Sequence, residues 1–249
     1  MVYGLTSADL GRPDYDLACA QHADYIGALQ ECGLEVTVLD ANEAYPDSCF
    51  VEDAALMTPH CAILTRPGAP TRQGEVALIE ATVSAVYDHV EQIEAPGTIE
   101  AGDIMMVDDH YYIGLSDRTN EQGADQMAVI LAKYGMQASL VDMSEMLHLK
   151  TGLSYLENNH LVACGEFVDK SQFSQFEILE IPMSDSYSAN SVWINDTVLV
   201  PAGFPATSAA VAALGEPLPY CRYVYPSTLR LDSFSDQLLA LVLLARWLV

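Results

Sequence analysis

The sequence predicts an α/β protein built from one repeated unit, in which two short strands joined by a turn are followed by a helix and a further strand. Two observations support this fold class. Short apolar runs alternate with turn residues along nearly the whole chain, as in proteins made of many short strands. The same order of elements returns at intervals of roughly 40 to 50 residues, which is typical of a propeller-like array. Such an array closes into a ring and leaves no sheet edge exposed.

The first unit follows a helix near the start of the chain. Apolar residues at helical spacing predict this helix over 16–32; it ends at Gly33 and leads into a strand-like run over 34–39. The unit itself begins with a turn that runs into a strand, and a second strand and a helix follow, over 45–53, 61–64 and 75–87.

Three later segments repeat this order. Strand pairs joined by turns are expected over 100–107 and 111–114, 153–156 and 161–164, and 191–194 and 197–200, with helices over 121–134 and 207–214. Four units are therefore visible, and a fifth requires the C-terminal segment to pair with the N-terminal one. Because no linker separates the units, we expect residues 1–249 to form a single domain.

The charge of the chain limits its partners. Ten Lys and Arg residues stand against 35 Asp and Glu, which gives a formal net charge of −25. Nucleic acid and anionic membranes are therefore poor partners, whereas a cationic small molecule is attracted. An acidic surface kept for solubility explains the same charge. The apolar C-terminal run, Leu238 to Val249, is shorter than a membrane span and would favour self-association into a homodimer.

The cysteines and the N-terminus indicate the compartment. The six cysteines are scattered without C-x-x-C spacing, which predicts mostly buried thiols in a reducing environment. The first residues lack the basic region and apolar core of a signal peptide. We therefore expect a cytoplasmic protein.

Polar residues flank the expected strands and would converge on the axis of a ring. The stretch Gly97–Asp103 places acidic residues and glycines directly before an apolar run, where backbone can approach a ligand closely, although an ordinary turn has the same composition. The full set of polar groups at strand and loop ends is Asp47, Glu52, Asp53, Arg72, Glu100, Asp103, Arg118 and His148.

These residue types suit an arginine-like amino acid. Paired carboxylates such as Asp53 and Glu100 can each accept bidentate hydrogen bonds from a planar guanidinium. Two loop arginines, Arg72 and Arg118, suit recognition of a carboxylate. His148 is open to two interpretations, a packed core histidine or a group at the end of a strand that faces the site. No His, Cys and Asp cluster has zinc-ligand spacing, so we expect no metal and no cofactor.

Six motifs resemble those of a known family. They are PDSCFVED over 46–53, TRPGAP over 65–70, GTIEAGD over 97–103, RTN over 118–120, HLKTG over 148–152 and PAGFP over 201–205. From Gly4 to about Gly215 the sequence resembles the bacterial dimethylarginine dimethylaminohydrolases, of the guanidine-modifying (amidinotransferase) superfamily. The resemblance implies the pentein fold, a five-bladed α/β-propeller of ββαβ-type repeats, which agrees with the repeat count.

The resemblance also implies a nucleophilic mechanism. His148 would be the general acid/base, Glu100 would hold the guanidinium beside it, and Asp53 would bind the guanidinium from its other side. In this chemistry a Cys thiolate attacks the guanidinium carbon, the histidine protonates the departing dimethylamine, and water then releases citrulline. The implied activity is hydrolysis of asymmetric dimethylarginine to citrulline and dimethylamine. An arginine deiminase or amidinotransferase activity is a weaker alternative.

The same resemblance implies how the rest of the substrate is bound. Arg72 and Arg118 would bind its carboxylate, and Asp47 and Glu52 would bind or brace its polar end. Leu5 would lie in a lid loop that closes over the site.

One part of the chain departs from the family. The family nucleophile is a cysteine near the C-terminus, but the corresponding stretch here, Leu231–Leu241, contains none, and Gln237 falls near its place. Cys221 lies well before this position and is interpreted as a packed or surface thiol. Ser235 would need a stronger base than the site offers.

Three explanations of this departure are open. The chain is a non-catalytic member that binds arginine-like ligands, it uses another nucleophile, or its tail from about residue 216 is out of frame. In the third case, codons GAC-CAG-CTG-CTN for Asp236–Leu239, shifted by one base, would encode Thr-Ser-Cys.

Overall fold

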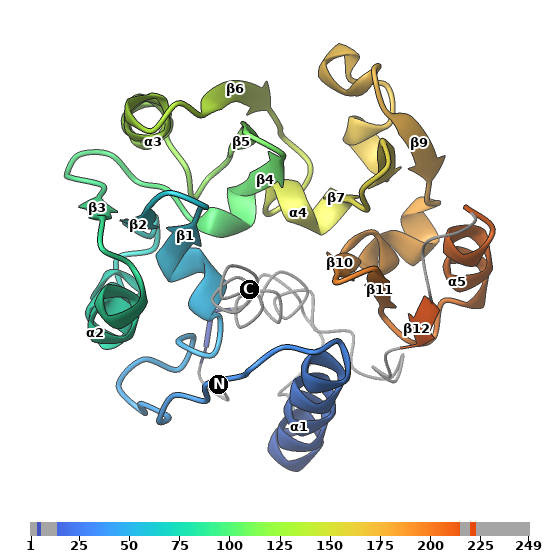
Figure 1. Cartoon of the computed structure of the whole chain (residues 1–249), viewed down its shortest axis with the longest axis horizontal. Coiled ribbons are helices and arrows are strands. Elements are labelled where there is room, and N and C mark those ends of the chain that lie inside the picture. The colour runs from blue at the N-terminus through green and yellow to red at the C-terminus, as the bar shows by residue number, and fades with distance from the viewer. Residues whose placement is uncertain (1–3, 6–13, 215–219, 223–249) are drawn as a thin grey trace.

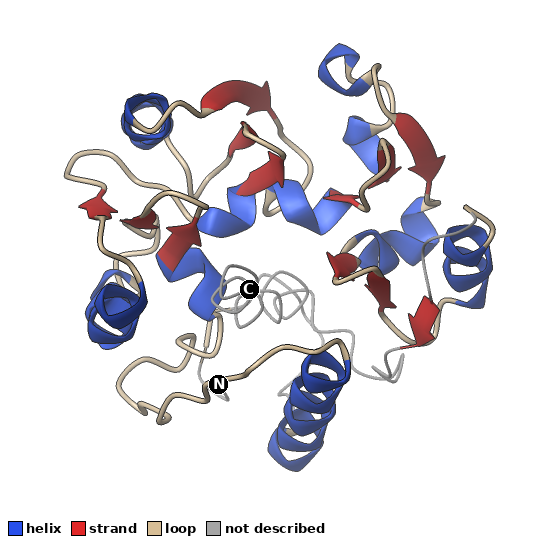
Figure 2. Cartoon of the chain, in the orientation of Figure 1, coloured by secondary structure: helices blue, strands red, loops and turns tan. Residues whose placement is uncertain are grey.

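The computed structural model describes residues 4–5, 14–214 and 220–222. Within this part, twelve strands form four three-stranded sheets arranged around a central axis, and the longer helices lie toward the outside (Figures 1 and 2). In every sheet the first strand pairs antiparallel with the second, and the second pairs parallel with the third. The strand arrangement of the predicted repeat is therefore present four times, and in the third unit 3-10 helices over Gly165–Phe167 and Ser171–Phe173 stand where the other units have an α-helix.

The bounds of the elements are as follows. The strands are β1 (Ala55–Met57), β2 (Ala62–Leu64), β3 (Val90–Gln92), β4 (Ile104–Val107), β5 (His110–Leu115), β6 (Gln137–Asp142), β7 (Leu153–Tyr155), β8 (His160–Ala163), β9 (Glu177–Glu180), β10 (Val192–Ile194), β11 (Thr197–Val200) and β12 (Tyr220–Arg222). The α-helices are α1 (Tyr15–Glu31), α2 (Val76–Val86), α3 (Glu121–Lys133), α4 (Leu149–Gly152) and α5 (Pro205–Ala212).

Local sequence signals explain the turns and helix ends. The hairpin turns contain Asp108, Asn158 and Asn195 at positive φ, a conformation that Asn and Asp adopt more readily than other non-glycine residues. Helix α3 begins at Asn120, whose side-chain oxygen accepts a hydrogen bond from the Gly123 N–H at 2.8 Å. This cap fixes the start of α3.

The N-terminal helix packs against the last sheet. Tyr25 and Leu29 of α1 are buried in one cluster with Ile194 and Leu199 of β10 and β11. The Asn195 side-chain amide also donates a hydrogen bond to the Cys32 carbonyl at 2.9 Å. The two ends of the described chain are thus adjacent, as a closed ring requires (Figure 1). The expected pairing of the C-terminal segment with the N-terminal one, and hence the single domain over 1–249, lies partly outside the described residues and stays a prediction.

Three strand predictions are wrong, one entirely and two in part. Residues 34–39 form no strand, because none of the described residues pairs with them, and Val38 is 59% exposed. The strands expected over 45–53 and 100–107 begin later. Residues expected to enter these strands instead form 3-10 helices over Val51–Ala54 and Ala101–Asp103. These helices are closed by hydrogen bonds from the Asp53 N–H to the Phe50 carbonyl and from the Asp103 N–H to the Glu100 carbonyl.

His148 is also placed differently from the expectation. It does not end a strand but directly precedes α4, a single helical turn before β7. In the part of the chain that the structure describes, no helix is long and apolar enough to cross a membrane.

Candidate functional site

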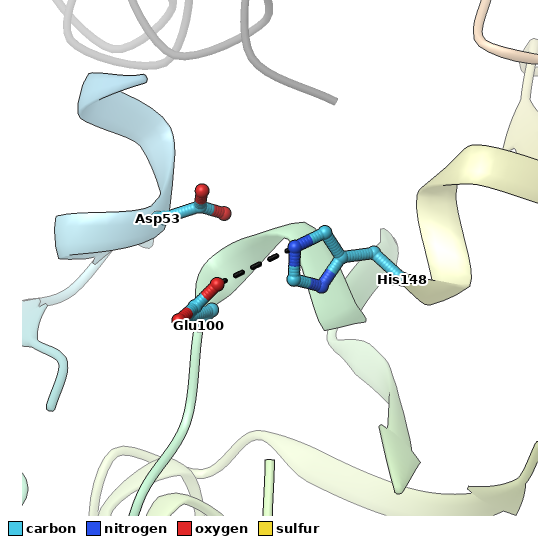
Figure 3. A group of neighbouring side chains, drawn as sticks. All are labelled: Asp53, Glu100 and His148. Carbon is cyan, nitrogen blue, oxygen red and sulfur yellow. Dashed lines mark ion pairs between the residues drawn. The ribbon is translucent and has the colours of Figure 1, made fainter. Parts of the chain in front are cut away.

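The site is carried by short turns that precede the first strands of three neighbouring sheets. Asp53 lies in the turn before β1, Glu100 precedes the turn before β4, and His148 precedes α4 and β7. Their side chains point toward one another (Figure 3), and their potential ligand atoms all lie within 4.8 Å of one another. All three side chains are buried. The structure therefore confirms the predicted convergence of these three residues.

Two carboxylates lie against the His148 ring. Its Nε2 is 3.4 Å from Glu100 Oε2, and its Nδ1 is 3.2 Å from Asp103 Oδ1. Asp103 is itself fixed, because its carboxylate accepts hydrogen bonds from the Ser116 and Thr119 hydroxyls at 2.7 and 2.6 Å. The Asp103 carboxylate therefore lies on the Nδ1 side of the ring, and the Glu100 carboxylate lies on the Nε2 side.

Sequence reasoning placed Asp103 among the converging polar groups but gave it no role. A signal for such a role was present in the spacing. Asp103 is three residues after Glu100, and the 3-10 turn over Ala101–Asp103 brings both carboxylates to the same ring.

The Glu100 carboxylate occupies an unusual electrostatic position. It accepts a hydrogen bond from the Gly68 N–H at 3.0 Å, and Arg72 and Arg118 lie 3.6 and 3.7 Å away. Burial and the neighbouring Asp53 carboxylate nevertheless raise the pKa of Glu100 to about 7. Burial also opposes ionisation of Asp53, but Arg72 and the Gly102 N–H hold its pKa below the usual range. Asp53 is therefore ionised at neutral pH, and a further positive charge would complete the ionisation of Glu100.

Gly102 shows why glycine occurs in the Gly97–Asp103 stretch. A Cβ atom on Gly102 would lie 2.8 Å from Asp53 Oδ1 and 3.3 Å from the His148 ring. Its N–H donates to Asp53 Oδ1 at 3.1 Å. Only glycine lets the backbone come this close to both side chains. This agrees with the expectation that the glycines of Gly97–Asp103 allow a close approach of the backbone.

The two predicted carboxylate-binding arginines differ in their surroundings. Arg118 is partly exposed and lies beside Glu100. Arg72 is buried, and its guanidinium donates to Asp53 at 2.7 Å, to Glu75 at 2.9 Å and to the carbonyls of Asp47 and Phe50. To bind a substrate carboxylate, Arg72 would have to release one of these acceptors, and that role stays a prediction.

The remaining predicted site residues lie at the edge of this cluster. The Asp47 carboxylate is buried and accepts hydrogen bonds from the Leu5 N–H at 3.0 and 3.1 Å, which connects the N-terminal segment to the site. Glu52 is buried and paired with Lys150. Leu5 is exposed, and most of the predicted lid around it, over 6–13, lies outside the described residues.

Asp53, Glu100 and His148 are also the residues that could hold a metal ion, since two oxygens and one ring nitrogen converge there. A guanidinium would compete for the same carboxylates. The expectation that no metal takes part stays a prediction.

Three of the described thiols do not have the properties of an activated nucleophile. Burial raises the pKa of Cys49 to about 12 and that of Cys164 to about 11, and it also raises the pKa of Cys61. A nucleophilic cysteine needs the opposite shift. Cys221 lies in β12, whose backbone alone is described, and Ser235 and Gln237 lie outside the described residues.

The raised pKa of Glu100 predicts a pH dependence of stability. An acid whose folded pKa lies above its unfolded value destabilises the fold as pH rises from about 4.5 to about 7. We therefore expect Glu100→Gln to raise the free energy of unfolding above pH 7 by up to about 3 kcal/mol, and to change it little below pH 4.5. Urea denaturation from pH 4 to pH 8 measures this difference. A wild-type-like profile for Glu100→Gln would contradict the prediction.

Comparison with known proteins identifies the family. The family model described as N,N dimethylarginine dimethylhydrolase, eukaryotic, matches residues 14–181. The chain is 56% identical over 216 residues to an N(G),N(G)-dimethylarginine dimethylaminohydrolase from Pseudomonas aeruginosa, which covers 86% of this chain and 85% of the relative.

Solved structures agree with this result. A cysteine-to-serine mutant of the Pseudomonas aeruginosa enzyme, complexed with citrulline, matches with a TM-score of 0.86 and 54% identity over 89% of this chain and 88% of that one. The N-terminal domain of the cyanobacterial arginine dihydrolase ArgZ matches with a TM-score of 0.80 over 97% of this chain and 90% of that one. At 17% identity the second match shows the fold alone. These matches confirm the predicted pentein fold, and the chain is a member of the dimethylarginine dimethylaminohydrolase family of enzymes.

Proposed function

We propose that this protein binds N-omega-methylated arginine at the Asp53–Glu100–His148 site, and that the site is built to hydrolyse asymmetric dimethylarginine to citrulline and dimethylamine. The observation that carries the proposal is the pair of buried carboxylates, Asp53 and Glu100, beside the His148 ring. A planar guanidinium can donate hydrogen bonds to both carboxylates at once, and its positive charge favours the ionised form of Glu100. Membership of the family supports the same substrate class.

The geometry suits the reaction as follows. With the guanidinium between Asp53 and Glu100, a nucleophile adds to its central carbon and forms a tetrahedral adduct. Collapse of the tetrahedral adduct breaks the bond to the dimethylated nitrogen, and His148 delivers a proton to this nitrogen so that it leaves as the amine. Water then adds to the same carbon, the nucleophile departs, and citrulline is released.

Contacts around His148 fit its proposed role. Asp103 lies 3.2 Å from Nδ1, and Nε2 faces Glu100 on the guanidinium-binding side of the ring. Arg118, partly exposed beside Glu100, is the better placed of the two arginines for the substrate carboxylate, while Arg72 is the group that keeps Asp53 ionised. In the proposed site, Leu5, Asp47 and Glu52 bind or brace the amino-acid end of the substrate.

A second function is binding without turnover. It is favoured by the sequence of the tail, where Gln237 takes the place near which the family has its cysteine. A deiminase or amidinotransferase reaction is a further alternative that uses the same carboxylates and histidine. Citrulline release from purified protein given asymmetric dimethylarginine tests the hydrolase directly, and labelling by a haloacetamidine reagent that substrate prevents would reveal an activated thiol.

The pKa of Glu100 predicts how ligand affinity depends on pH. A guanidinium prefers the ionised carboxylate, so binding of asymmetric dimethylarginine should tighten by about tenfold between pH 6 and pH 8 and then level off. Calorimetric Kd values across this range measure the effect. Neutral citrulline serves as the matched ligand, and its Kd should change much less.

The variant Glu100→Gln tests the contribution of this carboxylate alone, because glutamine has a similar shape and carries no negative charge. In that variant we expect weaker binding at pH 8 and a flatter profile. Equal pH profiles for the cation and for citrulline would contradict the proposed contact between Glu100 and the guanidinium.

A further inference from the structure

The buried carboxylate of Asp103 connects two neighbouring units of the ring. Its Oδ2 accepts hydrogen bonds from the hydroxyls of Ser116 at 2.7 Å and Thr119 at 2.6 Å, both in the loop after β5. Its Oδ1 accepts a hydrogen bond from the Leu149 N–H at 3.0 Å, at the start of α4, and lies against the His148 ring. The carboxylate therefore joins the unit of β4 and β5 to the turn before β7.

The two hydroxyls extend this connection to the backbone of the proposed site. The Thr119 hydroxyl accepts a hydrogen bond from the Glu100 N–H at 3.2 Å, and the Ser116 hydroxyl accepts one from the Arg118 N–H at 3.0 Å. A hydroxyl has one proton, and both hydroxyls donate theirs to Asp103. Hydrogen bonds from three separate segments of the chain thus end at one carboxylate.

These three segments carry groups that have to fit one ligand. In the proposed function Glu100 binds the guanidinium, Arg118 binds the carboxylate at the other end of the molecule, and His148 delivers a proton. Because these groups contact different atoms of one molecule, their spacing decides whether the ligand can reach all of them at once. Hydrogen bonds to a carboxylate are stronger than those between neutral groups, so a single buried acceptor can hold this spacing.

We propose that Asp103 is a positioning residue that fixes the placement of Glu100, Arg118 and His148 relative to one another. It acts through the hydrogen bonds that it accepts and not by contact with the ligand. The ligand in this inference is that of the proposed function, on which this part of the inference rests. The network itself belongs to the unliganded protein and can be tested there.

Amide hydrogen exchange in the unliganded protein tests the network. Asp103→Asn places an NH₂ group where three donors meet, so the amides of Glu100, Arg118 and Leu149 should exchange at least about tenfold faster relative to the Ile113 amide in the central strand β5. NMR measures the four rates in one sample. Faster exchange at Leu149 alone would overturn the proposal, because Asp103 would then hold only α4.

Two hydroxyl variants test whether the network serves ligand binding, and they do so even if Asp103→Asn fails to fold. N,N-dimethylguanidine has the guanidinium of asymmetric dimethylarginine but no carboxylate. Thr119→Val removes the link to Glu100 and should weaken binding of both ligands by about fivefold, whereas Thr119→Ser keeps the hydroxyl and should bind both like the original chain. Ser116→Ala removes the link to Arg118 and should weaken asymmetric dimethylarginine more than N,N-dimethylguanidine.

The split between the two ligands distinguishes positioning from a merely structural role. A structural network would lower the melting temperature of both hydroxyl variants without separating the ligands, and unchanged or equally reduced affinities in both variants would overturn the proposal. Asp109→Asn, at an exposed aspartate of the same sheet, is the matched control and should change neither affinity. If the original chain binds neither ligand, the proposed function fails, and the exchange rates alone decide whether Asp103 holds the three segments.

Discussion

Exchanging residues 216–249 for the corresponding ending of the Pseudomonas aeruginosa relative is expected to raise citrulline release from asymmetric dimethylarginine by at least about a thousandfold. The described site already contains the carboxylates and the histidine that the proposed reaction uses. What the sequence lacks is a cysteine in the stretch Leu231–Leu241, and the amide of Gln237 cannot attack a guanidinium carbon. Initial rates of citrulline formation, measured side by side for the two proteins, give the ratio.

The control is the same exchange with the donor segment's nucleophilic cysteine replaced by alanine, which should return the rate to that of the original chain. Comparable turnover by the original chain would contradict the prediction and point to another nucleophile, and Cys221→Ser would then be the next variant. The gene sequence at Asp236–Leu239 tests the frame-shift explanation separately, because codons that do not yield Thr-Ser-Cys after a one-base shift remove it.

Arg72→Met is expected to lower the free energy of unfolding by about 3–5 kcal/mol, the largest stability effect of any single substitution proposed for this site. Arg72 is 3% exposed and neutralises two buried carboxylates, those of Asp53 and Glu75. Methionine fills a similar volume but leaves both carboxylates without their cation, and they then become protonated or admit water. Urea denaturation at pH 7 measures the loss.

Arg66→Met is the matched control for this substitution. Arg66 is half-buried and donates to the Gly97 carbonyl and to the Gln73 side chain, both uncharged, so we expect a loss of about 1 kcal/mol. Adding Glu75→Gln to Arg72→Met should recover part of the stability, because one of the two uncompensated charges is removed. A loss below about 1 kcal/mol for Arg72→Met would show that the ion pairs contribute little.

The sequence was sufficient to predict the repeated unit and the convergence of Asp53, Glu100 and His148. Both predictions depend on short-range information, since apolar runs and turn residues define the strands and a ring directs their ends toward one axis. The resemblance of the motifs to those of the family then singled out these three residues among the polar groups. This is why the residues that meet in Figure 3 were found without coordinates.

Other features required the structure because no periodic pattern encodes them. The 3-10 helices over Val51–Ala54 and Ala101–Asp103 were expected to be part of strands. A 3-10 helix is closed by hydrogen bonds between residues three apart, and the alternation of apolar and polar residues that predicts a strand carries no information about such bonds. Residues 34–39 have strand-like composition, but a strand also needs a paired neighbour, and within the described part of the chain these residues have none. The partners of Arg72 come from separate segments around Asp47, Asp53 and Glu75, so its burial depends on tertiary packing alone.

The 3-10 and α turns at the inner ends of the sheets also determine how this fold can change its chemistry. Each turn is closed by hydrogen bonds within itself, and the sheet behind it is held by its own strand pairs. A substitution in one turn therefore replaces one functional group while the ladders of the other sheets persist. The residues that react and the residues that hold the sheets together are therefore largely different. A descendant of this chain could exchange one reacting group at a time, and each variant along the way would still fold.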